Sequence, residues 1–76
     1  MMHAVQVRMA RAALGISVRE LAERSGVADS TILRFETGKG AILTTNMARI
    51  QNSLEEAGVV FIPADATGGP GVRLKA

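Results

Sequence analysis

LAERSGVADSTILRFETG, from Leu21 to Gly38, has the pattern of two short helices separated by a glycine. Ser25-Gly26 ends the first helix, because glycine adopts without strain the left-handed conformation that closes a helix. Asp29 then begins the second helix, where an acidic residue suits the positive end of the helix dipole. The break sets the two helices at an angle and leaves one polar face of the second helix available to a partner.

Helical patterns continue on both sides of this stretch. A capping box, Ser17 with Glu20 three residues later, marks the start of the helix that ends at Ser25. The sequence predicts helices over four ranges: residues 4–14, 18–25, 29–37 and 45–57. Two apolar stripes run along the first of these helices. They consist of Val7, Ala10 and Leu14, and of Val5, Met9, Ala12 and Ala13. A helix that is apolar on so many sides is either well buried or shared with a partner.

The end of the chain changes from helix to strand chemistry. Residues 59–62 are four apolar residues in a row, residues 63–71 are rich in glycine and proline, and residues 72–74 alternate apolar and charged. We interpret the tail as a β-hairpin with a long loop, or as two strands that pair with another chain. The fold is therefore expected to be mainly α, with a four-helix domain over residues 1–58 and a dimerisation tail over residues 59–76.

The composition excludes several classes of protein. The 76 residues suit one small domain, and a disulfide framework is excluded because the chain has no cysteine. The one histidine, His3, lies in an N-terminal segment that we expect to fray, so we expect no metal site and no cofactor. No apolar run approaches the ~20 residues that cross a bilayer, and no secretory signal is evident. We therefore expect a cytoplasmic protein without a membrane contact.

The charge balance is mildly basic. Nine Lys and Arg residues against seven Asp and Glu residues give a net charge of +2, and seven of the nine cations are arginine. Arginine suits bidentate contacts to phosphates and base edges. Charge alone, however, favours an ordinary solvated surface, so the case for a nucleic-acid partner depends on the arrangement of the helices.

The motif of the opening stretch extends to both sides with a defined spacing. It contains Arg11-x-x-x-Gly15-Ile16-Ser17, Glu20-Leu21-Ala22, Gly26-Val27, Thr31-Ile32 and Phe35-Glu36-x-Gly38. With these residues the chain resembles the phage-repressor or Cro-like helix-turn-helix family, also called the xenobiotic-response-element (XRE) family, over about residues 5–57. Ala22, Gly26 and Ile32 occur together at the spacing that lets two helices cross closely.

The resemblance implies a four-helix, repressor-like domain that binds double-stranded DNA, since family members are mostly dimeric repressors. It implies that the second helix of the motif lies in the major groove and contacts base edges through Asp29, Ser30, Leu33 and Arg34. The implied phosphate contacts come from Ser17, Arg19, Thr37 and Lys39. We expect Thr31 at the helix crossing, with its hydroxyl within reach of a phosphate. Arg11 and Glu36 match a structural pair that ties the first helix to the end of the recognition helix.

The candidate base-contacting residues also have plain structural interpretations. Arg34 alone is an ordinary solvated arginine, Asp29 a helix-start charge, and Leu33 a half-buried side chain. Their spacing at i, i+3 and i+4 places them on one outward face, where we expect Arg34 to meet guanine and Leu33 a thymine methyl.

The chain departs from the family pattern in three places. Ala28 stands in place of a capping Ser or Thr, and Val18 stands in place of a polar residue. The tail stands in place of a fifth helix.

Three functional hypotheses follow. The first is a dimeric repressor that acts by occupying an operator with half-sites about 10 bp apart. The second is an antitoxin-type module that binds a small toxin and also DNA, with a tail able to add a strand to the partner's sheet. An enzyme is not expected, because the chain has no cysteine, a single N-terminal histidine and no pair of carboxylates that converges on an apolar pocket.

Overall fold

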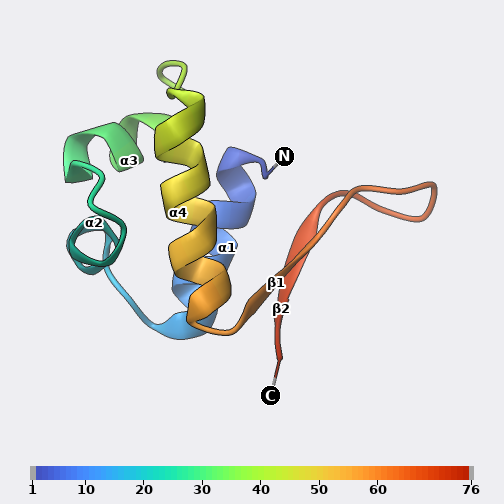
Figure 1. Ribbon diagram of the computed structural model, residues 1–76. Coiled ribbons are helices and arrows are strands. Elements are labelled where there is room, and N and C mark those ends of the chain that lie inside the picture. The colour runs from blue at the N-terminus through green and yellow to red at the C-terminus, as the bar shows by residue number, and fades with distance from the viewer. Residues whose placement is uncertain (1, 76) are drawn as a thin grey trace.

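A computed structural model describes residues 2–75 (Figure 1). Within them, four helices precede two strands: α1 (Ala4–Leu14), α2 (Val18–Ser25), α3 (Asp29–Glu36), α4 (Thr44–Glu56), β1 (Val59–Ile62) and β2 (Gly71–Leu74). The predicted mainly α fold with a C-terminal hairpin is confirmed. Three boundaries differ by one residue, and one of them is the end of α4, which closes at Glu56 with Ala57 as its C-cap. α3 ends before Thr37, whose backbone has already left helical geometry at φ −94° and ψ 3°, and α4 begins one residue earlier because Leu43 is its N-cap.

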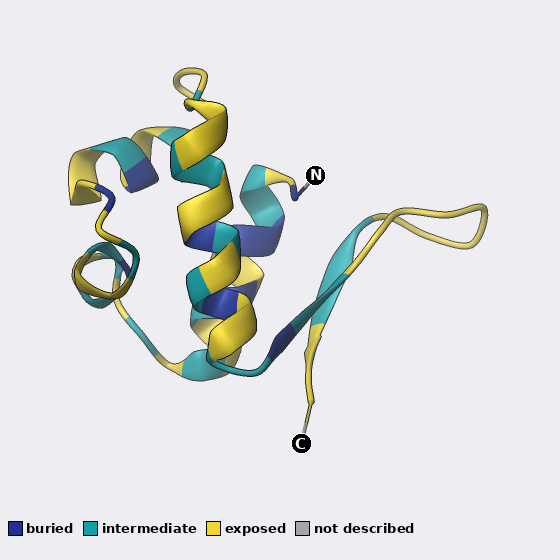
Figure 2. Ribbon diagram, viewed as in Figure 1, coloured by how far each residue is buried: buried dark blue, intermediate teal, exposed yellow. Residues whose placement is uncertain are grey.

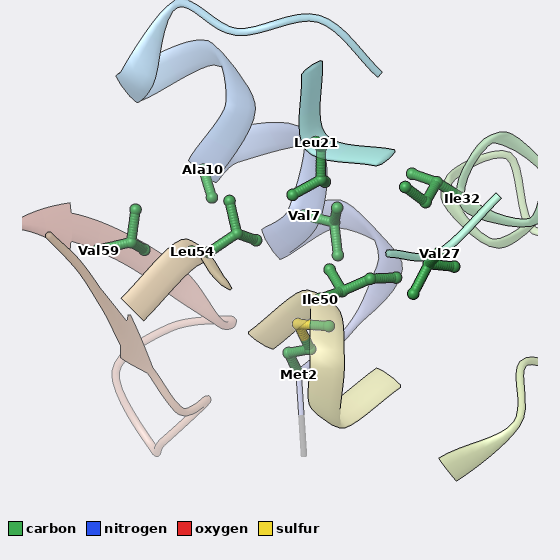
Figure 3. Close-up of a cluster of buried hydrophobic side chains, with 9 residues drawn as sticks. All are labelled: Met2, Val7, Ala10, Leu21, Val27, Ile32, Ile50, Leu54 and Val59. Carbon is green, nitrogen blue, oxygen red and sulfur yellow. The ribbon is translucent and has the colours of Figure 1, made fainter. Parts of the chain in front are cut away.

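All four helices contribute to a common core. Among the described residues, nine apolar side chains are buried: Met2, Val7, Ala10, Leu21, Val27, Ile32, Ile50, Leu54 and Val59 (Figure 3). α2 packs on α3 and on α4, and α1 packs on α3. Figure 2 shows the buried positions turned toward the interior, while the outer faces of α3 and α4 are exposed. Removing this apolar surface from water is what holds the short helices together.

The turn between α2 and α3 follows the predicted chemistry. Gly26 has a φ of 73° and a ψ of 14°, and its N–H donates to the carbonyl of Ala22 at 2.9 Å. A left-handed residue at this point closes α2 and redirects the chain. Val27 then enters the core, and its N–H donates to Oγ of Ser25 at 3.2 Å. The turn thus anchors α3 to the core and fixes its direction.

The tail forms a hairpin within the chain. β1 and β2 pair antiparallel, with Val59 opposite Leu74 and Phe61 opposite Val72. Opposed residues face the same side of a sheet, and on the inner side Val59 is buried while Phe61 and Val72 pack against the core. β1 contacts α4 and β2 contacts α1. Figure 1 shows the hairpin on the opposite side of α1 and α4 from α3.

Gln6 of α1 fastens the hairpin to the helices. Its side chain is buried, and Nε2 donates to the carbonyl of Ile62 at 3.1 Å and to that of Gly71 at 3.0 Å. Its Oε1 accepts from the backbone N–H of His3 at 2.7 Å. The side-chain amide therefore donates one hydrogen bond to each strand of the hairpin and accepts one from the backbone at the start of α1. Buried polar groups need such partners, because burying them without a hydrogen bond is costly.

The start of the chain differs from the expectation of a frayed segment. His3 is the N-cap of α1, and Met2 is 5% exposed within the core. The expectation is wrong for these two residues because the Gln6 side chain holds the backbone of His3, which keeps Met2 over the core.

The two apolar stripes of α1 have different environments. Val7 and Ala10 are fully buried, whereas Met9, Ala12 and Ala13 are exposed. The second stripe therefore remains an apolar surface on the outside of the domain. None of the helices between residues 2 and 75 has the length and the apolar content that crossing a bilayer requires.

Candidate nucleic-acid interface

The candidate base-contacting residues lie together on the outer face of α3. Asp29, Ser30, Leu33 and Arg34 are all exposed, and Leu33 keeps 53% of its surface accessible. The half-buried interpretation of Leu33 is therefore wrong. Ile32, on the opposite face, is fully buried. One face of an eight-residue helix is thus committed to the core, and the other presents a mixed polar and apolar surface of the kind that fits a DNA groove.

Ser17 begins α2 with a donor left for a ligand. Its Oγ accepts from the N–H of Glu20 at 3.0 Å, so the hydroxyl proton is not used in that bond. The Glu20 carboxylate accepts a hydrogen bond from Arg24 at 2.8 Å. Of the two hydrogen bonds in the predicted capping box, the one from the Glu20 N–H to the Ser17 side chain forms. Arg19, two residues into α2 from the cap, is exposed. Hydroxyl and guanidinium groups at a helix start are suited to phosphate oxygens.

The other candidate phosphate contacts lie on α3 and directly after it. Lys39 is exposed, while Thr31 is half-buried, in keeping with a position at the helix crossing. Thr37 is exposed, but its hydroxyl donates to the carbonyl of Leu33 at 2.8 Å. Thr37 therefore has to exchange that hydrogen bond before it can donate to a phosphate.

Arg11 and Glu36 form a bidentate ion pair between α1 and the end of α3. Arg11 Nε meets Glu36 Oε2 and Arg11 Nη2 meets Glu36 Oε1, each at 2.7 Å. The Glu36 side chain is 2% exposed, and the third guanidinium nitrogen of Arg11, Nη1, donates to the carbonyl of Ile16 at 3.2 Å. Hydrogen bonding to Glu36 raises the pKa of Arg11 above its ordinary value, although partial burial opposes the rise. The guanidinium stays charged in neutral solution and holds the C-terminal end of α3 in place.

Two further residues beside these elements were not predicted from the sequence. Gln6 gave no sign of its role, since its partners lie 56 and 65 residues further along the chain. Gly40 has no predicted role in the sequence, although the structure places it against the guanidinium of Arg34. A second glycine so soon after the helix-ending Gly38 was the signal that pointed to it.

The comparisons with known proteins match the helical part of the chain. A family model described as helix-turn-helix matches residues 7–56, well over half of the chain. The match covers most of α1 and all of α2, α3 and α4, and it stops before the hairpin. No curated protein matches the chain.

Proposed function

The chain belongs to the helix-turn-helix family of DNA-binding transcription regulators, and we propose that it is a homodimeric repressor that acts by occupying an operator. The observation that carries the proposal is the outer face of α3, where four candidate base-contacting side chains are exposed together. The proposal assigns the chain no enzymatic activity, because occupancy of a DNA site is enough to block transcription.

Each exposed residue of α3 has a matching base edge. Arg34 presents two donors that fit O6 and N7 of guanine, and Leu33 presents an apolar end to a thymine methyl. Ser30 donates to or accepts from either base. Asp29 accepts from N4 of cytosine, and it also favours the N-terminal end of α3 through the helix dipole.

Phosphate contacts position α3 without reading sequence. Ser17 and Arg19 at the start of α2 and Lys39 after α3 supply donors of this kind, with Thr31 and Thr37 as hydroxyl donors. These residues come from both helices of the motif and from the loop behind it. They would hold the domain to the DNA backbone on either side of the recognition helix.

A dimer follows from the small area that one recognition helix offers. A single DNA-binding module buries only about 600–1,000 Å² of protein surface, which is too little for tight specific binding. The hairpin supports a dimer because a two-stranded sheet has unpaired outer edges that a second copy can extend about a two-fold axis. We therefore assign residues 1–58 to DNA binding and residues 59–76 to dimerisation. The exposed stripe of α1 is the alternative interface.

An antitoxin-type module is the second candidate function. It is favoured by the position of the hairpin, which lies away from α3 and leaves strand edges accessible to a toxin while α3 occupies DNA (Figure 1). A full chain that forms a dimer without any other protein supports the repressor, whereas a monomer that gains high DNA affinity only with a second protein supports the antitoxin.

Selection from a random duplex library tests the proposed function. The full chain should enrich a palindromic site, and the two half-sites should lie on one face of the duplex, a whole number of about 10-bp turns apart. A variant with Arg34→Ala and Leu33→Ala serves as the control, because it keeps the phosphate-contacting residues and should lose the enrichment at the base pairs that Arg34 and Leu33 read. If the wild-type chain enriches no sequence over that control, α3 is not a reading helix.

A further inference from the structure

Arg34 lies against the loop that follows α3. A Cβ built on Gly40 would lie 3.2 Å from Nη2 of Arg34, 3.4 Å from Nε and 3.7 Å from Cζ. Contacts of 3.2 to 3.4 Å are tighter than most real Cβ contacts. A side chain at position 40 would therefore require the guanidinium to shift by a few tenths of an ångström.

A helix-ending turn brings Gly40 to this position. Gly38 is left-handed with a φ of 71°, its N–H donates to the carbonyl of Phe35 at 3.1 Å, and the N–H of Lys39 donates to the carbonyl of Arg34 at 3.0 Å. This pair of bonds is the Schellman motif, which folds the chain back over the last turn of a helix. The loop thus contacts Arg34 twice. The N–H of Lys39 bonds the backbone carbonyl of Arg34, and Gly40 lies beside the Arg34 side chain.

The backbone does not explain the glycine at position 40. Gly15, Gly26, Gly38 and Gly58 are the described glycines with a positive φ, and Gly40 does not belong to this group. Other residues can adopt its conformation, and a glycine in a loop adds conformational entropy to the unfolded chain. Gly40 is also exposed, so no core packing requires it. The Arg34 guanidinium is the neighbour that a side chain there would displace.

We propose that Gly40 is a positioning residue for base recognition, which leaves a side-chain-free surface where the guanidinium of Arg34 is held in one orientation before DNA binds. This inference rests on the proposed function. A bidentate contact needs both donors of the fork in a fixed plane, and a guanidinium that is already ordered loses less entropy on binding. Gly40 therefore sets the discrimination at the base pair that Arg34 reads, without touching DNA bases itself.

The test measures discrimination at a single base pair in the full chain. The selected site is first varied at each position, and the base pair whose preference is lost in Arg34→Ala is identified. Discrimination there is the ratio of dissociation constants for the altered and the selected duplex, measured by fluorescence anisotropy. We expect Gly40→Ala to lower this ratio by about 2- to 12-fold, the cost of immobilising one long side chain, and Gly40→Val to lower it further.

Gly69→Ala is the matched control. It makes the same chemical change at another exposed glycine without a positive φ, and a Cβ there meets nothing within 4 Å. It should leave the ratio unchanged. A second control is Gly40→Ala in the Arg34→Ala background, where it should leave the dissociation constant for the selected duplex unchanged because the positioned group is absent.

The outcomes separate this inference from the proposed function. If the wild-type chain enriches a site and both Gly40 variants keep the full ratio, the positioning role is wrong while the proposed function stands. If Gly40→Ala weakens binding to the selected duplex equally in the wild-type and the Arg34→Ala backgrounds, the positioning role is also contradicted, because Gly40 then acts through another group. If the wild-type chain enriches no site, the proposed function fails and the specificity role fails with it.

An NMR measurement tests the positioning of Arg34 in the absence of DNA. The order parameter of the Arg34 Nε–H bond in the free chain should fall in Gly40→Ala and stay constant in Gly69→Ala. An unchanged order parameter in Gly40→Ala would contradict the positioning of Arg34 before DNA binds.

Discussion

Glu36 has a buried carboxylate at the end of α3, and its two oxygens are met by one arginine from α1. An arginine fork and a carboxylate share a planar two-point geometry, so this pair fixes orientation as well as distance. The pair connects α1 to α3 across 25 positions of sequence. Its value to the fold lies in the order that it imposes on the end of α3.

Replacing Arg11 should destabilise the domain strongly. Arg11→Met leaves the Glu36 carboxylate buried without its partner, and we expect the free energy of unfolding to fall by about 3–5 kcal/mol. The double variant Arg11→Met/Glu36→Leu removes both charges and should recover most of that loss. Urea unfolding followed by circular dichroism measures both. A double variant no more stable than Arg11→Met would show that the loss comes from packing rather than from an unpaired charge.

Arg34 and Lys39 should affect DNA binding in different ways. Arg34→Ala should weaken binding to the selected site by about 1–3 kcal/mol and relax the preference at one base pair of each half-site. Lys39→Ala should weaken binding to all sequences alike and lower the salt slope of the binding constant by about one. Anisotropy titrations on selected and scrambled duplexes at several salt concentrations separate the two effects. A sequence-dependent loss in Lys39→Ala would exclude a pure phosphate contact.

The turn between α2 and α3 depends on one backbone conformation. A Cβ at Gly26 meets nothing within 4 Å, so the cost of a substitution comes from the positive φ alone. We expect Gly26→Val to lower the free energy of unfolding by about 1–3 kcal/mol, because a β-branched residue is strained at this φ. Gly69→Val, at a position without a positive φ, is the control in thermal unfolding. Equal melting temperatures for the two variants would mean that the strain at Gly26 is absent in solution.

Gln6 supplies side-chain hydrogen bonds from α1 to both strands of the hairpin. Gln6→Ala removes the donors to Ile62 and Gly71, and we expect a local loss of about 1–3 kcal/mol at the hairpin. The amides of β1 and β2 should then exchange with deuterium about 5- to 150-fold faster, while those of α2 and α3 change little. Gln51→Ala is the control, because the amide of Gln51 only meets exposed Glu55 at 3.4 Å. Uniformly faster exchange would instead mean that Gln6 supports the whole core.

The hairpin edge carries the proposed dimer. Lys75 N–H donates inward to the carbonyl of Gly58 at 2.9 Å, so the N–H of the preceding Leu74 points to the outer edge of β2. Leu74→Pro removes that outer donor and should give a monomer in sedimentation, whereas Leu74→Ala keeps the donor and should remain a dimer. Deleting residues 59–76 should also give a monomer, but a less stable one, because Val59 is part of the core.

A Leu74→Pro chain that remains a dimer would place the interface elsewhere. The exposed stripe of α1 is the alternative, and Met9→Lys is then the variant that should separate the two copies. The spacing of the selected half-sites gives an independent measure. Because the hairpin lies on the opposite side of α1 and α4 from α3 (Figure 1), a hairpin dimer separates the two α3 helices and favours half-sites more than one turn apart.

Features that depend on neighbouring residues were predictable from the sequence. Gly26 closes α2, Ser17 caps it, and the apolar period of α4 selects Ile50 and Leu54 for the core. The outward position of Leu33 and Arg34 follows from the helical spacing of residues around buried Ile32. These features depend on residues that lie within one or two helical turns of each other, so they can be read directly from the sequence.

Features that join distant parts of the chain became visible only once the elements were packed. Gln6 looks like one more polar residue of an amphipathic helix until the hairpin brings the carbonyls of Ile62 and Gly71 over it. Gly40 looks like ordinary turn chemistry until the loop folds back over the side chain of Arg34. No local sequence pattern signals either contact, since each depends on where a separate element packs. The docking is set by the shape of the whole core, and that is why the helices could be predicted one at a time while the support of the hairpin and of Arg34 could not.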